Sequence, residues 1–207
     1  MSAPSLLTPD QTDALQEVTN IAMGQAGSSL ANILGVFVNL SVPRIRVLDA
    51  ASIGAAISDM VGRDKEITAA RQSFHGTMRG GGEALVIYDQ EGCMDLADLM
   101  GYDGQLDAAA EREILLDVSN VQVGACLGGI ADLLEASLTY SAPSIMAERI
   151  PVDRLIDPKK MTWNYALLVE VNFTLEERNF TSHMTFLMPE ESIQSMGEAL
   201  DKFMENF

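Results

Sequence analysis

Residues 17–45 read EVTNIAMGQAGSSLANILGVFVNLSVPRI, and residues 117–145 read DVSNVQVGACLGGIADLLEASLTYSAPSI. The second stretch aligns with the first without a gap after subtraction of 100 from its numbering. The identical pairs are Val18 and Val118, Asn20 and Asn120, Gly24 and Gly124, Ala31 and Ala131, Leu34 and Leu134, Ser41 and Ser141, Pro43 and Pro143, and Ile45 and Ile145. Two such units are too few and too long for a solenoid. The pattern therefore predicts one domain, residues 1–207, made of repeats at about 9–101 and 107–206.

The first repeat is expected to begin with a long helix over residues 9–35. Thr8 suits the N-cap, with Pro9 at the first helical position. Gly35 is expected to end the helix. Helical spacing places one apolar stripe on the buried side, made of Leu15, Val18, Ala22, Ala26, Ser29 and Ile33.

The remaining segments predict a mainly antiparallel sheet with hairpin connections. Strands are expected at 37–48, 66–78, 83–89, 141–149, 161–173 and 179–188, and further helices at 91–100, about 107–137 and 190–206. Residues 52–61 are expected to form a short helix or turn region, and residues 151–160 a connector. Pro43 indicates an edge, bulge or bend, and the turn at 79–82 indicates a hairpin. Because the halves are so similar, we expect one joint sheet. The fold class is α+β: a duplicated pseudo-two-fold domain, with about six strands and two long exposed helices.

The composition limits the partners and the chemistry. With 30 acidic and 13 basic residues, the net charge of −17 argues against nucleic acid and anionic membranes as partners. No signal segment or apolar run near the length of about 18 residues is evident, so we expect a cytoplasmic protein. Cys93 and Cys126 lie in apolar helical stretches and are expected to be reduced packing residues. His75 and His183 have no metal-ligand spacing, so no metal site is expected.

A polar face is expected opposite the apolar stripe of the first helix. Its members share one side of a helix at about 100° per residue: Asp13, Glu17, Asn20, Gly24 and Ala31. The second helix repeats the face with Asp117, Asn120, Gly124 and Ala131. An acid and an amide beside small residues would let another protein approach closely. Exposed acids and amides are also ordinary surface residues, so these residues alone leave both interpretations open.

The spacing Asp13-x3-Glu17-x2-Asn20-x22-Pro43 resembles the signature of the CheC, CheX and FliY phosphatases of bacterial chemotaxis. All four positions of that signature are present in the first half. The second half reads Glu113-x3-Asp117-x2-Asn120-x22-Pro143, which keeps the amide and the proline but replaces the glutamate with aspartate. The resemblance extends over about residues 10–206, since duplication is itself a feature of that family.

The resemblance implies hydrolysis of the aspartyl-phosphate on the receiver domain of a response regulator, in chemotaxis or related two-component signalling. Asn20 would orient the attacking water, and Glu17 would dock against a cation of the receiver. The chain would need no cofactor of its own, because the receiver carries the Mg²⁺. The shorter side chain of Asp117 reaches less far, so we expect the Glu17–Asn20 site to be competent and the site at Asp117 and Asn120 to be weaker, inactive or specialised.

Two further readings stay open. The exposed helices could instead form a non-catalytic binding module for a response regulator or another chemotaxis protein, and the resemblance also implies a CheD-like protein as a candidate partner. The small-residue strips could support a homodimer, so the sequence leaves monomer and homodimer open.

Overall fold

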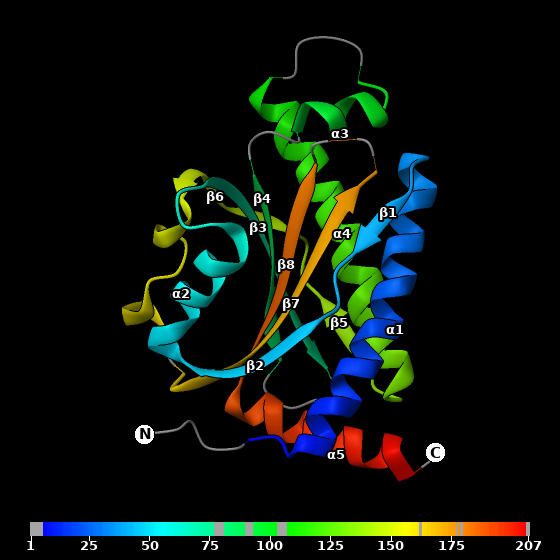
Figure 1. Ribbon diagram of the computed structural model, residues 1–207, viewed down its shortest axis with the longest axis vertical. Coiled ribbons are helices and arrows are strands. Elements are labelled where there is room, and N and C mark those ends of the chain that lie inside the picture. Colours follow the sequence, from blue (N-terminus) through cyan, green and yellow to red (C-terminus); the bar gives the residue numbers. More distant parts are fainter. Residues whose placement is uncertain are drawn as a thin grey trace.

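The computed structural model describes residues 6–76, 81–89, 93–102, 107–161, 163–176, 178 and 180–205. Two long helices lie side by side on one face of a twisted sheet, and a shorter helix covers the other face (Figure 1). The helices are α1 (Pro9–Leu34), α2 (Ala50–Val61), α3 (Cys93–Leu99), α4 (Ala108–Leu133) and α5 (Glu190–Glu205), with short 3-10 helices η1 (Val152–Arg154) and η2 (Pro158–Lys160). The strands are β1 (Val38–Leu40), β2 (Arg44–Asp49), β3 (Glu66–Gly76), β4 (Gly82–Asp89), β5 (Leu138–Tyr140), β6 (Ser144–Pro151), β7 (Tyr165–Leu175) and β8 (Thr181–Pro189).

Within the described residues, the sheet has eight strands in the order β1-β7-β8-β4-β3-β5, with β2 also paired to β7 and β6 to β3. All of these pairs are antiparallel, which confirms the predicted α+β fold class. The hairpins β3–β4 and β7–β8 meet in the middle through β4 and β8. Each half places its outer strands against the hairpin of the other half. The two repeats therefore share one sheet and depend on each other's hydrogen bonds.

The predicted count of six strands was too low. The segment expected as one strand over 37–48 is divided into β1 and β2, with Pro43 between them. In the second half α4 ends at Leu133 rather than near 137, and the following residues form β5. The prediction failed there because residues 134–140 contain good helix formers, and only pairing with β3 in the other half makes Leu138–Tyr140 extended. The first two residues of the expected turn at 79–82 lie outside the described residues.

Serine side chains continue the hydrogen bonding where the proline segments interrupt the outer strands. The backbone N–H of Asn172 donates to Ser41 Oγ at 3.0 Å. The backbone N–H of Ser73 donates to Ser141 Oγ, also at 3.0 Å. Ser41 and Ser141 thus have the same structural role in the two halves, and the strand is interrupted at Pro43, where an edge, bulge or bend was expected.

The predicted bounds of α1 are confirmed. The Thr8 side chain accepts from the backbone N–H of Gln11, whose side chain in turn accepts from Thr8, so the two form a capping box. At the other end Gly35 has φ of 68°, a left-handed conformation that glycine adopts without strain. The apolar stripe is buried as expected from Leu15 to Ala26. Its last member Ile33 was wrongly placed, because the buried face turns round the axis to Leu30 and Leu34.

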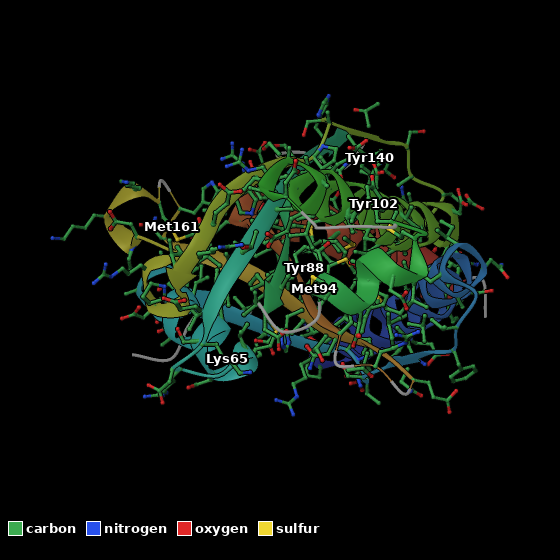
Figure 2. The ribbon with its side chains drawn as sticks, turned by 90° about the horizontal axis from the view of Figure 1, so that it is seen from above. Lys65, Tyr88, Met94, Tyr102, Tyr140 and Met161 are labelled. Atoms are coloured by element: carbon green, nitrogen blue, oxygen red, sulfur yellow. The ribbon has the colours of Figure 1, made fainter. Side chains whose placement is uncertain are left out.

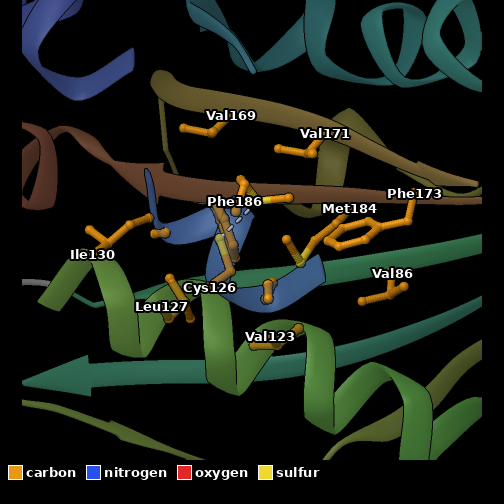
Figure 3. Close-up of a cluster of buried hydrophobic side chains, with 14 of the residues drawn as sticks. Val86, Val123, Cys126, Leu127, Ile130, Val169, Val171, Phe173, Met184 and Phe186 are labelled. Carbon is orange, nitrogen blue, oxygen red and sulfur yellow. Dashed lines mark hydrogen bonds between the residues drawn. The ribbon is translucent and has the colours of Figure 1, made fainter. Parts of the chain in front are cut away.

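Helix α4 packs its apolar side chains against the sheet and against α1 (Figure 3). Among the described helices, α4 alone is long and apolar enough to cross a membrane by length and composition, which corrects the expectation that no such stretch exists. However, 61% of that stretch is buried within the fold, as its apolar composition requires. Cys126 lies in this core beside Met23, and burial raises the pKa of its thiol. The side chain of Cys93 lies outside the described part.

Candidate functional site

Helix α1 carries the acid–amide pair on its outer face. Glu17 and Asn20 are both exposed, as their spacing predicts. In the described part of the chain, no hydrogen bond or salt bridge engages either side chain. One turn further on, Gly24 is exposed, and a Cβ built there would meet nothing within 4 Å. Both side chains of the pair are therefore available to contact another protein, and the glycine leaves the neighbouring surface of the helix flat.

Two exposed apolar side chains lie on α1 and in the segment that shares a groove with it. Ile21 is 39% exposed and follows Asn20 on α1, while Val42 is 67% exposed in the segment between β1 and β2. Val42 and Gln16 border a groove with a volume of about 770 Å³, which runs along the segment 41–46. Hydrogen-bonding groups between apolar contacts are typical of protein interfaces. This surface suits contact with a second protein.

An ion pair forms part of the groove lining and joins its two strands. Glu170 on β7 is only 4% exposed, and Arg46 on β2 binds its carboxylate. A buried carboxylate needs such compensation, because removal from water strongly disfavours its charged form. Sequence reasoning missed Glu170. The available signal was an acid within the apolar run of residues 166–171.

The second acid–amide pair lies on α4. Asp117 and Asn120 are exposed, and a Cβ built at Gly124 would meet nothing within 4 Å. Helices α1 and α4 run antiparallel (Figure 1), and they approach closely where a Cβ on Gly129 would lie 3.0 Å from Ala22 Cα. Glu17 and Asp117 are therefore separated by roughly 26 Å along the helix axes, at about 1.5 Å per residue. The structure does not bring the two pairs into one site.

The two pairs also differ in what lies beneath them. Gln72 on β3 donates from Nε2 to Asn120 Oδ1 at 3.3 Å and to the Ser141 carbonyl oxygen at 2.8 Å. Gln72 pairs with Ala84 on β4, and Val171 on β7 pairs with Met184 on β8. Ala84 and Met184 correspond at the offset of 100 between the repeats, so Gln72 and Val171 occupy corresponding strand positions. Valine cannot donate a hydrogen bond, so Asn20 has no equivalent tether. Sequence reasoning missed Gln72, although a polar residue between Ala70 and Phe74 in the buried register was a signal.

Neither histidine belongs to these pairs. Among the described residues, no cluster of three or more His, Cys, Asp or Glu side chains could hold a metal ion. His75 is exposed, whereas His183 is buried and its Nδ1 bonds Asn172 Oδ1 at 2.8 Å. Burial, with a smaller contribution from the charge of Lys65, lowers the pKa of His183 to about 4. His183 is thus neutral near pH 7 and has a structural role.

Solved structures with the same fold belong to chemotaxis and flagellar proteins. Thermotoga maritima FliY superposes with a TM-score of 0.71 at 21% identity, over 95% of this chain and 98% of that one. A chain of the FliG–FliM complex from H. pylori gives 0.61 at 12% identity, over 93% and 100%. CheX from Desulfovibrio desulfuricans gives 0.55 at 13% identity, over 82% and 99%. At these identities the matches define the fold.

A family model matches the sequence of α1 and the strands after it. The model of the CheC-like family matches residues 11–46, a stretch that contains Glu17, Asn20 and Pro43. Together with the shared fold, this match confirms the resemblance to the CheC-like family. No curated protein matches the chain.

Proposed function

We propose that this protein hydrolyses the aspartyl-phosphate of a response-regulator receiver domain. The match to the CheC-like family and the chemotaxis proteins of the same fold support a role in chemotaxis. The observation that carries the finer proposal is the pair on α1. Glu17 and Asn20 are exposed together, make no hydrogen bonds to the described residues, and lie within the segment that the family model matches.

The chemistry asked of these side chains is positioning. A receiver already holds the acyl phosphate and a Mg²⁺ ion that neutralises phosphoryl charge, so the remaining need is a water molecule in line with the phosphorus. The Asn20 carboxamide can both donate to and accept from that water without becoming charged. Glu17, one turn earlier, would pair with a cation of the receiver and hold α1 in register.

The fold makes α1 a suitable element for this task. Its N-terminus is closed by a capping box and its C-terminus by Gly35. Gln11 also donates to Asp201 on α5 at 2.9 Å. Its buried face packs into the core along most of its length. A helix fixed in this way can place an exposed amide reproducibly, and an error of about 1 Å in such a mechanism costs roughly 10²-fold in rate.

The test is the decay of a phosphorylated receiver domain with and without this protein. We expect wild type to accelerate the decay and Asn20→Ala to lose about 10²-fold of that acceleration. Asn120→Ala is the matched control on α4, and it should keep most of the activity. The folded wild-type protein should be tested against each receiver of the source organism. An unchanged decay rate with all of them would refute the proposed phosphatase activity.

A non-catalytic binding module is the second candidate. The same fold occurs in the FliG–FliM complex, so it also serves in stable assembly between proteins. The exposed apolar side chains of Ile21 and Val42 suit binding as well as catalysis. In that case a receiver or another chemotaxis protein would bind this chain without faster hydrolysis. Binding that is insensitive to Asn20→Ala but lost in Val42→Asp would favour the module.

A further inference from the structure

We propose that Gln72 is a positioning residue that holds Asn120 against the sheet and keeps the second acid–amide pair less active than the first. This inference rests on the proposed function, because it concerns the copy of the same site on α4. It names a second cause of the difference between the two pairs, besides the shorter side chain of Asp117. Gln72 lies outside the family motif and acts through Asn120 only.

The orientation of the Gln72 side chain is fixed by its surroundings. Its residue exposure is 3%, and the Ser141 carbonyl oxygen lies 2.8 Å from one end of its carboxamide. A carbonyl oxygen only accepts, so the end that faces it must be the NH₂ group. The same NH₂ group then donates its second hydrogen to Asn120 Oδ1. Gln72 Oε1 is left buried and has no hydrogen-bond partner among the residues that the structure describes.

Other side chains attach the same stretch of α4 to the sheet. Ser119 Oγ lies 2.7 Å from the Tyr88 hydroxyl, and Gln122 Nε2 donates to Ser182 Oγ at 2.8 Å. Tyr88 lies near the middle of the molecule in the view from above (Figure 2). On α1 the corresponding stretch has no such bonds within the described chain, and Thr19 Oγ1 is buried without a partner. The tether on Asn120 thus belongs to a helix that is bonded to the sheet on its inner side.

The tether opposes the task proposed for the amide. To orient water in another protein's phosphorylation pocket, the carboxamide must extend away from its own helix. Asn120 would first have to release Gln72, whose Nε2 is buried and would lose an acceptor. Breaking one such bond lowers the reactive population by about tenfold. Asn20 carries no such cost, because Val171 stands at the corresponding strand position.

The activity test uses a chain in which the first site is silent. In Asn20→Ala with Asp117→Glu, adding Gln72→Val should raise kcat for receiver dephosphorylation about tenfold and leave KM unchanged, since the docking surface is the same. Gln72→Met is the second variant, because it keeps the volume and removes the donor. Gln122→Met is the control: it also removes a buried amide under α4, but one that does not bond Asn120. No rise in kcat with either folded Gln72 variant would overturn the proposal.

A second readout needs no phosphatase activity. We expect the side-chain ¹⁵NH₂ group of Asn120 to show a more rigid heteronuclear NOE than that of Asn20, and Gln72→Val to make the two equal. Equal mobility in wild type would overturn the tether even if the protein proves to be a phosphatase. Restricted Asn120 mobility in a protein without activity would instead support the tether and reject the proposed function.

Discussion

The substitution Gly24→Leu should raise the stability of this fold and lower its proposed phosphatase activity. Gly24 lies on the exposed face of α1, one turn beyond Asn20, and no atom lies within 4 Å of the Cβ position. Gly124 on α4 is half-buried, and a Cβ built there also meets nothing within 4 Å. The two glycines therefore offer a matched pair of substitutions, Gly24→Leu and Gly124→Leu, whose Cβ atoms the folded chain accepts without a clash.

The expected stability change follows from helix propensity. Glycine inside a helix costs about 0.8–1 kcal/mol relative to alanine, and leucine is close to alanine. Each substitution should stabilise the fold by about 0.8 kcal/mol. For a domain of this size such a gain raises Tm by roughly 2–3 °C. Thermal unfolding followed by circular dichroism measures both changes, and we expect them to be equal.

The expected activity change differs between the two sites. A leucine at position 24 adds an isobutyl group beside Asn20 and would hold a docked receiver away by more than 1 Å, so kcat/KM should fall by about 10²-fold. Gly124→Leu should leave the rate of receiver dephosphorylation near that of wild type. If Gly24→Leu raises Tm and keeps full activity, the receiver does not dock over this face of α1.

Two further predictions concern stability alone. Gly129→Ala should destabilise the fold by about 1–2 kcal/mol, because its Cβ would lie 2.9 Å from a side-chain atom of α1. Gly128→Ala, whose nearest neighbour is 4.0 Å away, should stabilise it by about 0.5–1 kcal/mol in urea unfolding, and equal effects would contradict the close helix approach. The pKa of His183 falls from 6.5 to about 4 on folding, so the unfolded chain takes up the proton first and stability is lost as pH falls through that range. His183→Gln should therefore remove about 2 kcal/mol of the loss between pH 7 and 5, whereas the exposed-residue control His75→Gln should not.

The sequence predicted the fold class because its strongest signals are local. The cap at Thr8, the stop at Gly35 and the helical spacing of the apolar residues act within a few turns, and they set the bounds of α1 correctly. The strand count failed where structure depends on distant partners. Leu138–Tyr140 is extended because it pairs with β3, more than sixty residues earlier in the chain. No periodicity within three residues can carry that information.

The same limit applies to the candidate site. Outward projection of Glu17 and Asn20 follows from about 100° per residue on a single helix, and the structure agrees. The bond between Gln72 and Asn120 joins a strand to a helix 48 residues away, and it depends on the register of β3 against the rest of the sheet. Sequence spacing predicts which residues share a helix face, but it cannot predict which side chain of a neighbouring strand lies beneath them.

The exchange of outer strands gives the asymmetry of the two sites a simple origin. After duplication, each long helix still begins its own repeat, while each outer strand pairs with the other repeat's hairpin. Gln72 on β3 therefore bonds Asn120 on α4, whereas Asn172 on β7 bonds Ser41 in the segment after α1. Gln72 and Val171 occupy corresponding positions on these strands, so a single difference there can restrain one amide and leave the other free. Exchanging only these two residues, as Gln72→Val with Val171→Gln, should then move the rigid side-chain amide from Asn120 to Asn20. If both amides keep their wild-type mobility in the folded double variant, the difference between the sites lies in the helices themselves.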